Sequence, residues 1–145
     1  MAFDPGARKQ LEAWLESFAE CVRRVDAESA RPLFAASLRA FGTRVFCAEG
    51  QEAVEQQQWR YIWPRTRDFA FETESLEGWL SADASQASLA VPWRSTGFDA
   101  EGRAFERRGR ATIVLVRAGA DWQAHHTHFS VDPAAQHPVL GRPRP

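Results

Sequence analysis

Apolar residues near the start of the chain recur with the period of an α-helix. Leu11, Trp14 and Phe18 lie three or four positions apart, and charged side chains occupy the positions that face the other way. Asp4 is a good N-cap, and the proline that follows it suits the first helical position. The spacing therefore predicts an amphipathic helix over about residues 5–25.

The next stretch of the chain predicts shorter elements. Asp26 can cap a second helix, which would carry Leu33 and Phe34. Residues 41–46 have the composition of a short strand. A glycine then precedes an apolar stripe, and a proline ends it, which predicts a third helix over about residues 51–63.

Beyond the third helix, the pattern changes to the alternation that is typical of β-strands. Apolar and polar residues alternate around 69–71, and residues 77–82, with Trp79 and Leu80, predict another strand. Glycine-containing turns separate three longer segments, 86–97, 104–117 and 122–131, and the first two should form a hairpin. Helices followed by a run of strands predict an α+β fold with an antiparallel sheet.

The length and the composition fit one domain. The 145 residues contain neither a repeat nor a linker, so residues 1–131 are predicted to form a single domain. Four prolines fall in the segment 132–145, which is predicted to be an irregular C-terminal tail. Six tryptophans and ten phenylalanines can fill a large core or line a cavity for apolar ligands.

Charge and cysteine content narrow the setting in which the protein works. A net charge of −1 disfavours a nucleic-acid partner, because domains that bind nucleic acid carry a basic excess. The uncharged stretches are too short to span a bilayer, so no membrane contact is expected. Cys21 and Cys47 follow no secretory leader, and they are expected to be reduced thiols in a cytoplasmic protein.

The last third of the chain has a recognisable arrangement of residues. The arrangement begins with Arg110-x-Thr112, which a run of aliphatic residues and a turn follow. After the turn come Trp122 and then His126-x-His128-x-Ser130. With the helical segments before it, this arrangement resembles the SnoaL-like branch of the nuclear transport factor two-like superfamily, over about residues 8–131. Within that group the chain is most similar to the association domain of calcium/calmodulin-dependent protein kinase and its small bacterial relatives.

The resemblance implies a cone-shaped fold, a cystatin-like α+β roll in which a strongly curved antiparallel sheet wraps around the N-terminal helices. It also implies a pocket at the open end of the cone. Members of the superfamily include isomerases, cyclases, dehydratases and scaffolding domains, so the fold leaves the chemistry open. The kinase association domain places arginines in its pocket, whereas the aligned positions here are Trp93, Ile113 and Phe129. The resemblance therefore implies an apolar pocket that does not take the same anionic ligands.

The candidates for the wall of this pocket are mostly aromatic. About half of the tryptophans and phenylalanines among them are expected to be plain core, since regular spacing alone does not separate core from cavity wall. The candidates are Trp14, Phe18, Trp59, Trp63, Trp79, Trp93, Ile113, His125, Thr127 and Phe129.

The histidines of the last strand are the candidate chemistry. Because side chains alternate along a strand, His126 and His128 should share one face with Trp122. His125 and Thr127 fall on the other face, which is the pocket side in the alignment with the family. There His125 is a candidate general acid or base, a hydrogen-bonding partner for one ligand oxygen, or only a structural polar residue.

Two other groups of polar side chains have less specific interpretations. His126 and His128 could share a metal ion, but no third ligand is evident, so no metal is expected and a place within the sheet or a dimer interface is favoured. No phosphate-binding loop, HExxH or CxxC motif occurs, and no cofactor is expected. Crowded arginines on one strand are expected to be a solvated or interfacial charge ladder: Arg103, Arg107, Arg108, Arg110 and Arg117.

These observations favour a homodimeric small-molecule-binding domain with an apolar aromatic pocket and an apolar or aromatic ligand. The dimer is expected because both faces of the last strand carry apolar residues, so that one face needs a partner subunit. An isomerase- or dehydratase-like general acid–base enzyme on an apolar substrate is the first alternative, and it depends on His125. An assembly domain with a vestigial pocket is the second.

Overall fold

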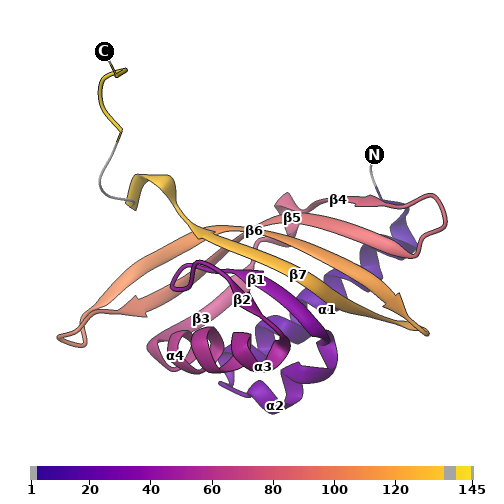
Figure 1. The fold of residues 1–145 in the computed structure, drawn as a ribbon, viewed down its shortest axis with the longest axis horizontal. Helices are drawn as coiled ribbons and strands as arrows, with labels where there is room; N and C mark the ends of the chain where they lie inside the picture. The colour runs from indigo at the N-terminus through magenta and orange to yellow at the C-terminus, as the bar shows by residue number, and fades with distance from the viewer. Residues whose placement is uncertain (1–2, 136–139, 145) are drawn as a thin grey trace.

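Helical segments dominate the first half of the chain and long strands the second, which confirms the predicted α+β class (Figure 1). The computed structural model describes residues 3–135 and 140–144. The division into a domain at 1–131 and a tail at 132–145 stays a prediction.

The predicted N-terminal helix forms as α1, Pro5–Arg23. The Asp4 carboxylate caps it by accepting a hydrogen bond from the Ala7 amide at 3.0 Å. One face of α1 is buried along its length, and Leu11 and Leu15 on that face have no exposed surface. The helix therefore docks through the apolar stripe that its spacing predicts.

The segment after α1 differs from the prediction at Phe34. The second helix is short, and it consists of α2, Ala27–Ala30, and a 3-10 turn, Arg31–Leu33. Phe34 does not belong to it but begins strand β1, Phe34–Phe41. Apolar residues four apart in this stretch resemble a helical stripe. The segment instead pairs with a distant strand, because strand formation depends on such partners more than on local preference.

The strand predicted over residues 41–46 is wrong for the same reason. The strand lies earlier in the chain, as β1, and residues 42–47 form a loop. The loop leads into the two-residue strand β2, Ala48–Glu49, which pairs with β1.

The third helix forms where the sequence predicts it, but its geometry is not uniform. Four helical pieces follow one another without a break: α3, Gln51–Val54, a π-helical turn, Glu55–Trp59, α4, Arg60–Ile62, and a 3-10 turn, Trp63–Arg65. A π-helical turn widens the helix, and such turns are frequent at functional sites.

The strands of the second half agree with the alternation in the sequence. The three long strands lie within one residue of their predicted bounds at each end. The strands are β3, Thr66–Phe71, β4, Glu77–Leu80, β5, Gln86–Phe98, β6, Ala104–Ala118, and β7, Asp121–Val131.

One mixed sheet contains all of the described strands. Its order is β2-β1-β7-β6-β5-β3, with β4 paired to β5. β5 and β6 form the predicted hairpin. β1 runs parallel to β7, so the sheet is not purely antiparallel as the sequence predicts. A parallel pair joins segments that are distant along the chain, and local turn signals therefore do not reveal it.

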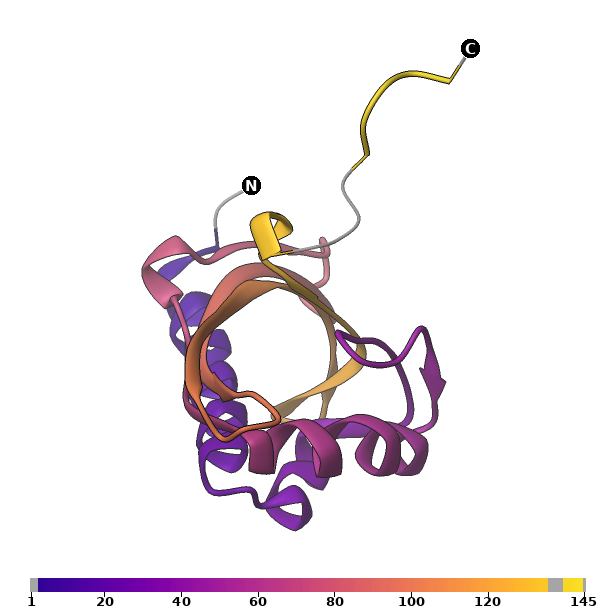
Figure 2. The same ribbon diagram turned by 90° about the vertical axis from the view of Figure 1, so that its left-hand side faces the viewer.

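The sheet is strongly curved, as the family resemblance implies. In Figure 2 the long strands curl round, and α1, α3 and α4 lie along the open side of the curve. The concave face is almost completely buried, with Leu89, Ile113 and Leu115 fully inaccessible to solvent. None of the described elements covers the opposite, convex face of β5–β7 (Figure 1).

Two observations relate to the predicted setting of the protein. In the residues that the structure describes, no helix has the length and the apolar character needed to cross a membrane. Cys21 is buried, Cys47 is half-buried, and both are free. The cytoplasmic location stays a prediction.

Candidate functional site

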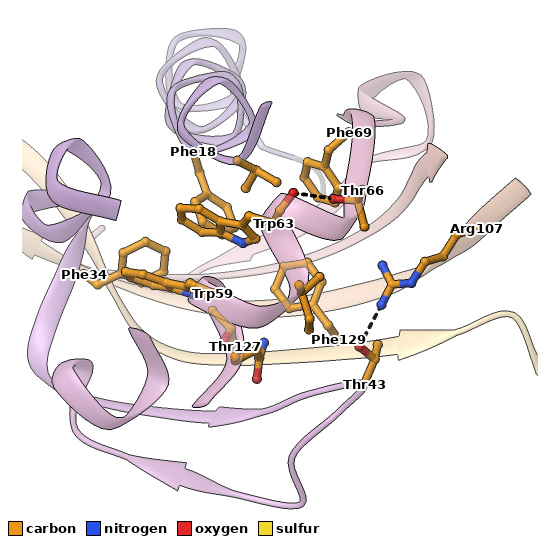
Figure 3. Close-up of a pocket in the computed structure, with 13 residues that line it drawn as sticks. Phe18, Phe34, Thr43, Trp59, Trp63, Thr66, Phe69, Arg107, Thr127 and Phe129 are labelled. Atoms are coloured by element: carbon orange, nitrogen blue, oxygen red, sulfur yellow. Dashed lines mark hydrogen bonds between the residues drawn. The ribbon is translucent and has the colours of Figure 1, made fainter. Parts of the chain in front are cut away.

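A small cavity lies between α1, the helical segment 51–65 and the concave face of the sheet. Its volume is about 40 Å³. Aromatic rings from five separate parts of the chain form a large part of its wall (Figure 3): Phe18, Phe34, Trp59, Trp63, Phe69 and Phe129. Two aliphatic side chains, Val22 and Ile62, and five side chains with polar groups complete it: Thr43, Gln58, Thr66, Arg107 and Thr127.

The rings form one connected aromatic cluster. Trp59 and Trp63 are four residues apart on the helical segment, and they stack with centroids 5.0 Å apart and planes at 17°. Phe34 contacts Trp59 at 4.9 Å, and Phe18 lies 5.0 Å from Phe34 and 6.3 Å from Phe129. The cluster therefore links helix to sheet, and a change in one ring is transmitted to its neighbours.

The present volume limits what the cavity holds without rearrangement. A buried water needs about 10–15 Å³ of such space, so the cavity has room for roughly three waters. Sites for drug-sized ligands measure about 300–1,000 Å³. A ligand with a ring therefore enters only if wall side chains move.

Gln58 lines the cavity and carries an unsatisfied amide oxygen. The residue is 6% exposed, and its Oε1 atom has no hydrogen-bond partner in the part of the chain that the structure describes. Gly42 makes room for this amide, because a Cβ atom at that position would lie 2.0 Å from Oε1. A buried acceptor without a partner is destabilising by about 1–3 kcal/mol. A donor from water or from a ligand would remove that penalty.

Arg107 is the charged side chain of the cavity. It extends from β6 across the open side, and its Nη2 donates a hydrogen bond to the Thr43 hydroxyl at 2.8 Å (Figure 3). Its guanidinium carbon lies 5.0 Å from the centre of the Trp93 ring. Within the described residues no carboxylate lies within ion-pair distance of it. Burial lowers the pKa of the Arg107 guanidinium, since water is largely excluded from it.

The prediction that Arg107 belongs to a solvated or interfacial ladder is therefore wrong. Side chains alternate along β6, and Arg107 has the same parity as the buried Ala111 and Ile113. That parity is visible in the sequence, and it is the signal that could have placed this arginine on the concave face. Gln58 had no comparable signal, because its burial depends on the π-helical turn and on the loop around Gly42.

The structure brings five of the ten predicted pocket residues to the cavity. Their part in binding a ligand stays a prediction. These five are Phe18, Trp59, Trp63, Thr127 and Phe129. Trp14, Trp93 and Ile113 are buried in the core behind the wall and do not line it.

Trp79 was predicted in the pocket wall, but it lies on the outside of the molecule. It is 47% exposed on β4. The neighbouring residue, Gly78, faces the interior. A Cβ atom at that position would lie 1.8 Å from the Phe3 ring, which occupies the space of a side chain. The alternation of the strand then directs Trp79 to solvent.

The prediction that His125 faces the pocket is also wrong. Val114 pairs with His126, while Leu115 pairs with Ala124, so His125 is the extra residue of a β-bulge. The bulge interrupts the alternation. Ala124 and Thr127 face the core, whereas His125 is exposed.

The other two histidines of β7 lie on the convex face of the sheet. The Nδ1 atom of His126 is 2.7 Å from the Arg39 carbonyl oxygen, which fixes Nδ1 as the donor. The rings of His126 and His128 pack edge-on against Phe41, at 5.0 and 5.4 Å. No group of three or more metal-ligating side chains occurs among the described residues. That the protein needs no metal stays a prediction.

Comparisons with known proteins relate this architecture to a widespread fold. No protein-family model matches the sequence, and no curated protein sequence matches it either. Solved structures do match. A nuclear transport factor two-like protein from Salmonella enterica superposes with a TM-score of 0.73 at 13% identity, over 92% of this chain and 95% of that one. The fold is that of the nuclear transport factor two-like superfamily.

Two further structures with the nuclear transport factor two-like fold extend the comparison. A ketosteroid isomerase-like protein from Erwinia carotovora has a TM-score of 0.74 at 14% identity, and the match covers 88% of this chain and 98% of that one. A Xanthomonas campestris protein assigned to the calcium/calmodulin-dependent protein kinase II association domains has a TM-score of 0.69 at 15% identity, over 88% and 86% of the two chains. At these identities the similarity concerns the fold alone, because one fold carries many functions.

Proposed function

We propose that this chain is a small-molecule-binding domain and that the aromatic cavity is its binding site. The observation that supports the proposal most directly is the Gln58 side chain, which lines the cavity and whose buried amide oxygen has no hydrogen-bond partner among the described residues. Core polar groups are nearly always satisfied, so an unsatisfied acceptor in a ring-lined cavity is typical of a site that is completed by a ligand or by water.

The cavity favours a ligand with one aromatic or apolar ring. Its wall offers ring faces and edges to such a group, and the Gln58 and Thr127 side chains can orient it by hydrogen bonds. A single ring that buries on the order of 150 Å² gains about 4 kcal/mol from burial, before the cost of association is subtracted. Part of that gain is spent on moving wall residues, since the cavity measures about 40 Å³.

The acid–base enzyme receives no support from this site. Neither a carboxylate nor an imidazole is found among the described residues that line the cavity. His125, on which that alternative depended, is on the outside of the sheet. We therefore assign the cavity a binding role and no catalytic step.

Titration with neutral one-ring compounds tests the binding site. Trp59 and Trp63 line the cavity, so a bound ring should change the tryptophan fluorescence in a saturable way. Trp59→Phe should weaken binding at least about fivefold, since it replaces one indole of the stacked pair with a smaller ring. Fivefold corresponds to about 1 kcal/mol of binding free energy. Trp79→Phe is the matched control, because Trp79 is exposed and does not line the cavity. Equal affinities for both variants would contradict this location of the site.

We also propose that the protein is a homodimer that pairs through the convex face of the sheet. Two rows of side chains cross this face from strand to strand. One consists of Ala90, Thr112, His128 and Phe41, and the other of Ser88, Val114, His126 and Arg39. Only Arg39 in these rows is always charged, and it is paired with Glu49 at 2.9 Å. This part of the face is poor in charge, which suits an interface with a second copy.

Light scattering at micromolar concentration tests the dimer. The expected mass is twice the 16.3 kDa of the chain. Val114→Arg should reduce the mass to that of one chain, since two arginines would face each other across the symmetric interface. Ala100→Arg, in an exposed turn at the end of the hairpin, should leave the dimer intact. A monomeric mass for the unmodified protein would rule out the dimer.

A further inference from the structure

The cavity opens into a larger groove, which we call the mouth groove. The two share Thr43, Ile62, Thr66 and Arg107 as common wall. The groove has a volume of about 470 Å³, against about 40 Å³ for the cavity. A ligand that enters the cavity from this groove therefore passes Arg107.

Two further arginines are held in place at the rim of the mouth groove. Arg44 and Arg65 lie on the Tyr61 ring, with guanidinium carbons 3.4 and 3.8 Å from its centre. Arg65 also donates a hydrogen bond to the Tyr61 carbonyl oxygen at 2.8 Å. These contacts restrict both side chains before any ligand arrives, which reduces the entropy that a bound anion would have to offset.

The positive charge of this groove is not neutralised by the chain itself. No carboxylate is found among the described residues that line the groove, and none of the ion pairs in the described structure involves Arg44, Arg65 or Arg107. The chain as a whole has a net charge of −1, and several other arginines are paired with acidic residues. Three arginines around one opening therefore form a local excess of positive charge.

We propose that the mouth groove is an anion site and that the ligand of the cavity is a one-ring aromatic carboxylate. The ring would contact Phe129 and the stacked tryptophans, and the carboxylate would pair with Arg107, with Arg44 and Arg65 at the rim. A guanidinium matches a carboxylate with two parallel hydrogen bonds, and exclusion of water strengthens such a pair. The inference rests on the proposed function, because it names the ligand class of the same site.

This inference revises the expectation that the pocket does not take the anionic ligands of the kinase association domain. That expectation followed from the positions aligned with the arginines of the kinase association domain, which are apolar here. Arg107 supplies a guanidinium from a different position on β6.

A matched pair of probes tests the inference by calorimetry. Phenylacetate and phenylacetamide have nearly the same shape and differ in charge. The carboxylate should bind at least about tenfold more tightly, and added sodium chloride should weaken its binding but not that of the amide. Arg107→Met keeps an unbranched aliphatic side chain at this position but removes the guanidinium over Trp93, and it should reduce the affinity ratio to nearly one. Arg110→Met is the control on the same strand, because Arg110 lies on the convex face, where it bonds to Ser130.

The outcomes separate the inference from the proposed function. Equal affinity for the two probes would overturn the anion site and leave the binding function intact. If neither probe binds, both fail. Should Arg107→Met not fold, the double variant Arg44→Gln/Arg65→Gln serves instead, and it should weaken phenylacetate several-fold without changing the binding of phenylacetamide. If the double variant binds phenylacetate as tightly as the unmodified protein does, the rim arginines are not part of the site.

Discussion

Replacement of Gly109 with alanine is expected to lower the free energy of unfolding by about 3 kcal/mol. Gly109 lies in the middle of the sheet, paired with Trp93 on β5 and with Val131 on β7. A Cβ atom there would lie 1.8 Å from the Ser130 carbonyl oxygen and 2.6 Å from the Trp93 ring. Backbone of a neighbouring strand cannot swing aside, so the strands themselves would have to separate.

The same substitution should also disturb the cavity. The Trp93 ring occupies the space over Gly109. Its centroid lies 6.2 Å from that of the Phe129 ring and 5.9 Å from that of the Phe69 ring. Both phenylalanines line the cavity. Displacement of Trp93 therefore reaches the binding site through two ring contacts.

Urea unfolding followed by circular dichroism measures this effect, with Gly97→Ala as the control. Gly97 lies on the same hairpin, but the nearest atoms to a Cβ there belong to the Phe105 ring, 2.6 Å away, and not to backbone. Phe105 is 47% exposed and can move into solvent. The control should therefore change the free energy of unfolding by less than about 1 kcal/mol. Similar losses for the two variants would show that close approach to the β7 backbone is not the cause.

Replacement of Glu55 with glutamine is expected to lower the free energy of unfolding at neutral pH by about 2 kcal/mol. The Glu55 side chain is 4% exposed and begins the π-helical turn that carries Gln58 and Trp59. Its carboxylate accepts two hydrogen bonds from Arg31, at 2.7 and 3.1 Å, and one from Arg60. Both arginines remain about half exposed, so they can be rehydrated, which limits the loss.

The effect of Glu55→Gln should depend on pH. The hydrogen bonds from Arg31, together with the contact to Arg60, lower the pKa of Glu55 from its ordinary value of 4.5, against the opposing effect of burial. Because the folded pKa is the lower one, the stabilisation is present above about pH 4.5 and is lost as the pH falls through the folded pKa. The difference between the two proteins should therefore be largest near neutrality and should shrink towards acidic pH.

Unfolding curves for both proteins at a series of pH values measure this difference. Glu52→Gln is the control, because Glu52 is exposed on the same helical segment and is not in any ion pair described in the structure. A gap that stays constant between neutral and strongly acidic pH would show that the charge of Glu55 does not stabilise the folded state.

Periodicity in the sequence was sufficient to predict most of the elements. The stripe of α1 and the alternation of β5, β6 and β7 arise from residues that are close along the chain, because each pattern reports one buried face of one element. The family resemblance then placed those elements in the correct fold, which the comparison structures share. For β1 the local pattern was misleading, since that strand forms through its pairing with the distant strand β7 and with β2.

The sequence by itself determined that the protein is an α+β domain rich in aromatic rings. The tertiary structure decided which rings enclose the cavity and which polar groups enter it. A single extra residue in β7 turned His125 outward, and no local pattern announces a bulge of that kind, because it depends on the register with β6. Arg107 entered the site because the curved sheet directs its concave face towards α1 and the helical segment. An inward-facing side chain near the start of β6 therefore reaches the mouth of the cavity.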